Sequence, residues 1–250
     1  MARKRSRRKS ALSPTKFKTT GKDARMKIDD KKAKTYYFRT KVDSDEAKTL
    51  ASRDASEMFG VSSESLKVSK PRLKYDFYCI YEAEMEMTFL RVRKQEIGVN
   101  DEVKGVLVGK EVMKPKKGRE IPGKAIKLEL VEMFEIERSD SMILDGSTGA
   151  PARSLEPLLT GPGKKGASSS WIAKAKISSG KYNSIEKVVR QVAKAAAKAP
   201  KDAKKVTDHT LSFRKLRGLY VPTYYIRIKH GDDSKTMRVN AVDGSVSLRV

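Results

Sequence analysis

The sequence has few of the residues that support redox, metal or nucleophilic chemistry. Its 250 residues include one cysteine, Cys79, so no intramolecular disulfide is possible, and we expect a reducing compartment. The only two histidines, His209 and His230, are neither near Cys79 in the sequence nor part of a recognisable nucleophile motif, and no Cys and His set has zinc-ligand spacing. We therefore predict that the protein is not an enzyme and has no catalytic residues, metal ion or cofactor.

Long apolar runs are also lacking. No stretch approaches the roughly 18 apolar residues that a membrane span requires, and the basic residues 1–9 are not followed by the apolar run of a signal peptide. Hydrophobic residues still make up 38% of the chain, which is enough to form a core at this length. We expect a soluble protein without a membrane span that is cytoplasmic, or nuclear if the organism is eukaryotic.

Acidic residues are outnumbered, and the excess of positive charge is unevenly distributed. The chain has 55 Lys and Arg against 31 Asp and Glu, a formal charge of +24. Residues 1–41 contain 16 Lys and Arg against three acids, and residues 160–220 contain 15 against three, so the rest of the chain is close to neutral. Charge concentrated in this way is typical of a protein that binds nucleic acid. A solubilising tail is the alternative, and it explains the first segment better than the second.

Residues 1–35 lack periodicity and are rich in Lys, Arg, Ser and Thr, which predicts a basic disordered arm that could order on binding. Its first nine residues carry six of the cations that we expect to contact nucleic acid. These are Arg3, Lys4, Arg5, Arg7, Arg8 and Lys9.

A first α+β module is predicted over residues 36–159. Asp43 is placed to cap a helix that Gly60 ends. Apolar side chains then occupy the odd positions of residues 73–89, which predicts a long strand with one buried face. We expect the other face to be solvated; it carries Lys74, Asp76, Glu82, Glu84 and Glu86. Two further strands are predicted at 103–112 and 125–137.

Residues 160–180 have the composition of a basic Gly/Ser linker. Gly161 and Gly166 have the spacing of a phosphate-binding loop, but Ala167 stands where that motif requires lysine, so the linker interpretation is preferred.

A second module over residues 181–250 follows the same order, with a helix at 184–199 stopped by Pro200 and then several strands. The strands are predicted at 206–213, 221–230, 236–242 and 245–250.

The order of elements in the second module, and the pairing of residues 221–228 with 239–246, resembles the PepSY-like repeat. Residues 142–149 resemble the corresponding turn of the first module. The resemblance implies an α+β fold of two small modules, each a helix packed on a curled antiparallel sheet. It implies no catalytic residues.

The predicted helix at 184–199 carries the most specific candidate site. Its apolar residues follow the spacing of a buried stripe. Five cations lie along a different side of the helix, and the last of them comes just after its predicted end. Glu186 is its only acid, whereas an ordinary solvated face mixes both signs. The predicted contact residues are Lys187, Arg190, Lys194, Lys198 and Lys201, followed by Arg214, Lys215 and Arg217 in the next strand.

Two further groups of side chains have open interpretations. Six aromatic residues lie close to cations and could stack on bases, or they could face the core, which we favour for Tyr224. They are Tyr36, Tyr37, Phe38, Tyr220, Tyr224 and Tyr225. The row Glu82, Glu84 and Glu86 could bind a cation or a basic partner, but such a row is more often the wet face of a sheet.

The sequence therefore predicts a non-enzymatic protein that grips the phosphate backbone of DNA or RNA with little reading of bases. The alternative is an adaptor or assembly subunit that binds a protein partner through its sheet edges. In that case the basic segments serve docking or solubility. A membrane-surface role is opposed by the predicted helix at 184–199, whose apolar side lacks bulky anchors.

Overall fold

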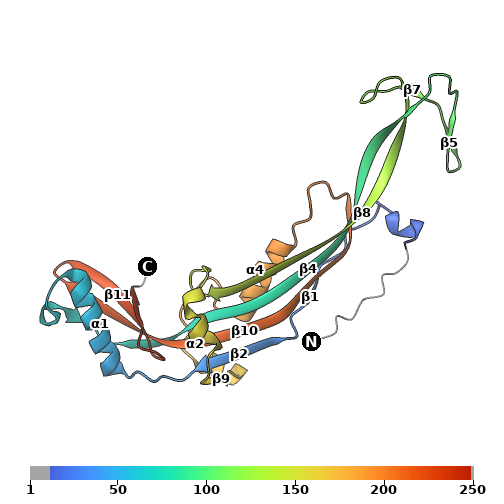
Figure 1. Cartoon of the computed structure of the whole chain (residues 1–250). Coiled ribbons are helices and arrows are strands. Elements are labelled where there is room, and N and C mark those ends of the chain that lie inside the picture. The colour runs from blue at the N-terminus through green and yellow to red at the C-terminus, as the bar shows by residue number, and fades with distance from the viewer. Residues whose placement is uncertain (1–11, 249–250) are drawn as a thin grey trace. The chain divides into compact units, whose positions relative to one another are not determined.

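The computed structural model describes residues 12–248 and shows an α+β protein dominated by one large mixed sheet (Figure 1). Its contacts divide the chain into two compact units, each assembled from three separate stretches. The first unit comprises Met1–Lys27, Met85–Arg138 and Lys198–Thr210. The second unit comprises Ile28–Glu84, Ser139–Ala197 and Leu211–Val250. The prediction of two consecutive modules is therefore not confirmed, and the likeness to PepSY stays a prediction.

Three strands are long enough to run through both units: β4 (Arg72–Val99), β8 (Lys124–Asp145) and β10 (Lys205–His230). The hydrogen-bonded order of the sheet is β12-β11-β10-β4-β8-β7. β10 replaces the two strands predicted at 206–213 and 221–230, because the residues between them continue in extended conformation and pair with a neighbour.

The alternation predicted for β4 is confirmed on one face and only in part on the other, where Glu82 and Glu86 are exposed as predicted. Odd-numbered side chains from Phe77 to Phe89 are all buried. On the face predicted to be solvated, Asp76 is 1% exposed, and Tyr78 and Ile80 beside it are buried as well. Local periodicity cannot detect a second layer, and here the strand is covered on both sides.

One face of the second unit's sheet is covered by helices. The even-numbered side chains Tyr224, Ile226 and Ile228 of β10 share a core with α1 (Ser44–Phe59). The helix lies against β11 (Figure 1). Its predicted caps are confirmed: Asp43 accepts hydrogen bonds from two backbone N–H groups, and Gly60 ends it in the left-handed conformation.

Two more helices, α3 (Ser169–Lys174) and α4 (Ile185–Ala196), cover the same face further along. Ile185 of α4 lies against Gly218 of β10, another even-numbered position. Trp171 of α3 stacks on Tyr37 with ring centroids 4.3 Å apart. The side-chain alternation of β10 therefore places α1 and α4 on one side of the sheet.

The opposite face is covered by the short helices η3 (Arg153–Leu155) and α2 (Glu156–Thr160). Leu159 of α2 and Ala152 share a core with Tyr78 of β4 and Leu219 of β10. The second unit thus has three layers, which explains why β4 is buried on both faces here.

Strands also form inside segments predicted to be an arm and a linker. β1 (Lys27–Asp29) and β2 (Ala33–Phe38) lie at or near the end of the expected arm, and β2 pairs in parallel with β10. β9 (Lys164–Gly166), in the expected linker, pairs antiparallel with β2. These pairs join residues more than 120 positions apart, so no local pattern announces them.

The remaining edge of the second unit is antiparallel. β10 pairs with β11 (Asp233–Asn240), which pairs with β12 (Val246–Leu248), and the chain turns between them at 231–232 and 241–243. β3 (Lys67–Val68), preceded by η2 (Ser63–Ser65), adds two residues beside β10.

The first unit contains the continuations of the long strands and a separate hairpin. Here β7 (Lys116–Lys117) pairs with β8. The hairpin consists of β5 (Val106–Val108) and β6 (Glu111–Met113), where one strand at 103–112 was predicted. Gly109 (φ +61°) turns the chain between them. The unit also contains η1 (Pro14–Phe17).

Candidate functional site

The candidate nucleic-acid contacts of the second unit are held on α4. Ser184 caps this helix by accepting a hydrogen bond from the backbone N–H of Lys187. The predicted apolar stripe is buried through Ile185, Val188 and Val189. Lys187, Arg190 and Lys194 are exposed, as expected for the face away from that stripe.

The cationic row is shorter on this helix than the sequence predicts. α4 ends at Ala196, so Lys198 and Lys201 lie beyond it and belong to the first unit. Pro200 keeps the helix from continuing through Ala199, because a proline disfavours helical conformation in the residue before it. The prediction that five cations follow one rigid helix is therefore wrong for the last two.

The segment that leads into α4 extends the positive charge. From Lys164 to Lys194 the chain carries eight Lys and Arg and a single acid, Glu186. Within residues 12–248, none of these eight cations forms an ion pair with a carboxylate. Lys187 instead donates to Asn183 Oδ1 at 2.7 Å, and Lys164 donates to two backbone carbonyls.

Among the described residues, two of the cations predicted on β10 form ion pairs, unlike those on α4. Arg214 pairs with Glu84 at 2.5 Å, and Lys215 pairs with Glu82 at 3.2 Å. Phe213 and Leu216, which flank this pair of cations, are both buried although they are three residues apart. The alternation of the strand therefore shifts by one residue here, as at a β-bulge, so the two adjacent cations can point to the same side. Part of the predicted acidic row therefore neutralises part of the predicted basic site.

Arg217 keeps a cationic neighbour rather than an acidic one. It is paired in register with Lys34 of β2. Burial, together with the charge of Arg217, lowers the pKa of Lys164 below its ordinary value. Arg217 thus lies opposite Lys34 of β2 and close enough to Lys164 of β9 for their charges to interact.

The aromatic side chains offer little for stacking on bases. Tyr37 is already stacked on Trp171, and Tyr225 donates its hydroxyl hydrogen to Asp76. Tyr224 is buried in the core of α1, as expected. The predicted contacts Arg3, Lys4, Arg5, Arg7, Arg8 and Lys9 lie outside the described residues.

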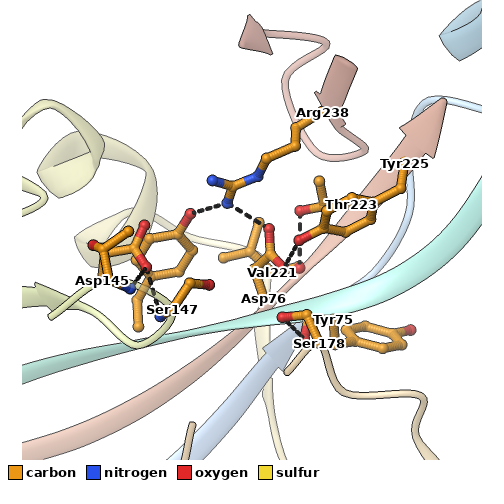
Figure 2. Close-up of polar contacts among 11 residues, drawn as sticks. Tyr75, Asp76, Asp145, Ser147, Ser178, Val221, Thr223, Tyr225 and Arg238 are labelled. Atoms are coloured by element: carbon orange, nitrogen blue, oxygen red, sulfur yellow. Dashed lines mark hydrogen bonds and ion pairs between the residues drawn. The ribbon is translucent and has the colours of Figure 1, made fainter. Parts of the chain in front are cut away.

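A buried polar cluster, which sequence reasoning missed, lies on the other face of the second unit (Figure 2). Arg238 of β11 donates through Nη2 to Asp76 Oδ2 at 2.6 Å and to the Tyr78 hydroxyl at 3.2 Å. The Tyr225 hydroxyl donates to the other Asp76 oxygen at 2.5 Å. The only signal in the sequence was Asp76, a single charged residue among the apolar side chains of residues 75–81.

Arg238 and Tyr78 also line a cavity of about 280 Å³. Its floor comes from strands β12, β11, β10 and β4, and its wall from the turn after β8. Asp145 stands in that wall, held by hydrogen bonds from the backbone N–H groups of Ser147 and Thr148. Hydroxyl groups of Ser154, Ser247 and their neighbours complete a polar lining.

The electrostatics of this cluster favour a structural role. Burial is the largest single effect and would lower the pKa of Arg238, but the charge of Asp76, its hydrogen bond and the neighbouring Tyr78 and Tyr225 together outweigh burial. The pKa is therefore raised and the guanidinium stays charged. Burial raises the pKa of Tyr78 well above its ordinary value. Since Asp76 balances Arg238 and Asp145 adds a negative charge, the cavity has no net attraction for an anion.

No constellation for metal or nucleophilic chemistry is found among residues 12–248. No group of three or more His, Cys, Asp and Glu side chains is placed to hold a metal ion there. Cys79 is buried, and burial raises the pKa of its thiol to about 12, so the reactive thiolate is suppressed. No helix in this part of the chain has the length and apolar character needed to cross a membrane.

Comparison with known protein families, curated proteins and solved structures finds no match to this chain.

Proposed function

We propose that the protein binds nucleic acid without catalysing a reaction, and that α4 contacts the phosphate backbone. The observation that carries this proposal is the contrast within one basic segment. Lys187, Arg190 and Lys194 are exposed and have no acidic partner among the described residues, whereas Arg214 and Lys215 on β10 are paired with acids.

The lack of ion pairs on α4 within residues 12–248 distinguishes it from an ordinary solvated helix. An exposed helix face normally mixes signs, since ion pairs between residues three or four apart stabilise it slightly. The cations of α4 are spaced 3 and 4 residues apart and form no such pairs among the described residues. The other side of the helix is buried in the core. Such a row is suited to neutralising successive phosphates.

The test is a salt titration with charge-reversed variants. Fluorescently labelled duplex DNA, single-stranded DNA and RNA are titrated with protein freed of nucleic acid. The test variant is Lys187→Glu/Arg190→Glu/Lys194→Glu. The control variant, Lys48→Glu/Lys67→Glu/Arg72→Glu, changes the net charge equally at exposed positions of the same unit.

If the three cations each neutralise one phosphate of a duplex, they contribute about −2.7 to the slope of log K against log salt. We expect the α4 variant to lose affinity and to show the shallower slope, while the control stays close to wild type. Equal loss in both variants would reduce the proposal to a net-charge effect. Absence of binding by the wild type near physiological salt would refute it and favour the adaptor alternative.

A further inference from the structure

The hairpin of β5 and β6 is an isolated element in the described part of the chain. Its register pairs Val106 with Met113, Leu107 with Val112 and Val108 with Glu111. These strands form a sheet of their own and pair with no other strand between residues 12 and 248. A lone two-stranded hairpin is marginally stable in water, so an element of this kind gains order when a partner covers it.

The hairpin exposes the apolar residues that would normally stabilise it. The cross-strand partners Leu107 and Val112 are 68% and 72% exposed, and Val108 is 37% exposed. Five of the six strand residues are apolar, although the two strands pair only with each other in the part of the chain that the structure describes. These neighbouring aliphatic side chains are available to contact a partner.

The charges around this pair select the partner. Residues 104–119 contain six Lys and Arg and one acid, Glu111. Five of the cations are lysines, all exposed and none joined to a carboxylate within residues 12–248; they are Lys104, Lys110, Lys114, Lys116 and Lys117. Elsewhere in the same unit, Arg91 pairs with both Glu132 and Asp202, so cations there do find acidic partners. A polyanion would supply the negative charges that the lysines of the hairpin lack.

We propose that the β5–β6 hairpin is a second nucleic-acid contact, which enters a groove of a duplex. The lysines would lie on the phosphates, and Leu107 and Val112 would pack against sugars and base edges. A two-stranded ribbon fits the major groove of B-DNA, and aliphatic side chains are used as wedges in the minor groove. This inference rests on the proposed function and adds an apolar contact that α4 does not provide.

The composition argues against an anionic membrane as the partner. Residues 97–122 contain no Trp, Tyr or Phe, and Trp and Tyr are the residues enriched at the interface between membrane and water. The apolar surface is also confined to a hairpin of two three-residue strands.

The decisive variant removes the apolar pair without altering charge. Leu107→Ser/Val112→Ser is compared with the control Ile28→Ser/Leu248→Ser, which replaces two exposed aliphatic residues of the second unit. Binding to a labelled duplex is measured at four salt concentrations, and circular dichroism verifies that each variant is folded. We expect the hairpin variant to bind about tenfold more weakly at every salt concentration with an unchanged salt slope.

A second variant separates the electrostatic part. Lys110→Gln/Lys114→Gln should make the salt slope shallower by about 1.8 on duplex DNA. Together, the two variants distinguish an apolar contact, which shifts affinity uniformly, from phosphate contacts, which change the slope.

The outcomes separate this inference from the proposed function. If the α4 variant loses binding but neither hairpin variant differs from wild type, the hairpin inference is overturned and the proposed function stands. If Leu107→Ser/Val112→Ser instead abolishes co-sedimentation with anionic phosphatidylserine vesicles or dimerisation in analytical ultracentrifugation, and leaves duplex binding unchanged, another partner occupies the hairpin and the inference is likewise overturned. If the wild type binds no nucleic acid, both proposals fail.

Discussion

Asp76 and Arg238 show how much one buried ion pair depends on its surroundings. Asp76 is fully enclosed, and Arg238 keeps 19% of its side chain exposed. The charge of each is offset mainly by the other and by the hydroxyl groups of Tyr78 and Tyr225. The Arg238 Nε atom is buried without a hydrogen-bond partner among the described residues, so the cluster contains one unsatisfied donor. Such a pair is costly to assemble and more costly to break, because removing one partner leaves the other charged in the interior.

We expect Arg238→Met to lower the free energy of unfolding by about 3 to 5 kcal/mol, because it leaves the Asp76 carboxylate buried without its counter-charge. Urea denaturation followed by circular dichroism measures the change. Arg227→Met, an exposed arginine on the neighbouring strand, serves as the control and should cost little.

A double variant tests whether the two residues act as a pair. Asp76→Asn/Arg238→Met should destabilise the protein by clearly less than the sum of the two single replacements. Strict additivity would contradict the coupling inferred from the 2.6 Å contact.

At the scale of elements, the position of α4 depends on a glycine in the strand beneath it. A methyl group on Gly218 would lie 2.9 Å from Ile185 Cγ1 of α4 and 2.8 Å from Phe77 Cε2. Both neighbours are buried, so neither can move without disturbing the core. Gly218 therefore lets α4 approach the sheet closely, and so it determines how far the cations of α4 lie from β10.

Gly218→Ala is expected to destabilise the protein by about 1 to 3 kcal/mol through this clash. Thermal and urea unfolding measure the loss. Gly166→Ala is the matched control, because Gly166 also lies in a strand of the second unit but has no described atom within 4 Å of the place that an added methyl group would occupy. Similar stability of the two variants would show that α4 tolerates a wider separation from β10.

For the whole molecule, several buried and half-buried tyrosines link stability to alkaline pH. Burial, and then the charge of Asp76, raises the pKa of Tyr225 to about 12, and burial raises the pKa of Tyr78 and Tyr81 as well. In the unfolded chain these groups titrate near pH 10. Above that pH the unfolded state loses protons that the folded state retains, so stability falls as the pH rises.

We therefore expect the free energy of unfolding to decline progressively between about pH 10 and pH 12, from the ordinary pKa of tyrosine to the raised pKa of Tyr225. Urea unfolding at about pH 8, 10 and 11 measures the decline. Tyr225→Phe removes one titrating group, so its stability should depend less steeply on pH even though the variant is less stable throughout. A pH dependence identical to that of wild type would show that Tyr225 does not contribute.

Charge is the other property of the whole molecule, and the fold separates cations that are paired with acids from cations that are not. In the second unit, the acids of β4 neutralise Arg214 and Lys215. The cations of α4 are left without acidic partners among residues 12–248. Composition alone gives both groups the same weight, and only the contacts across strands distinguish a binding surface from an internal ion pair.

The sequence by itself determined the features that depend on neighbouring residues. Asp43 and Gly60 mark the ends of α1 because caps act within a turn, and the odd-numbered apolar positions of β4 predict its buried face because strand alternation is local. The buried stripe of α4 followed in the same way, as did the location of the excess charge.

Only the tertiary structure decided which segments meet. β2 pairs with β10, and β9 with β2, across long separations in sequence, so residues expected to form an arm and a linker contribute strands. Asp76 is buried because a second layer covers the face that alternation assigns to solvent. Arg214 and Lys215 lose their free charge to acids of β4, a strand far away in the sequence. Pairing partners at such distances are chosen by packing and hydrogen bonding of the whole sheet, which no local pattern contains.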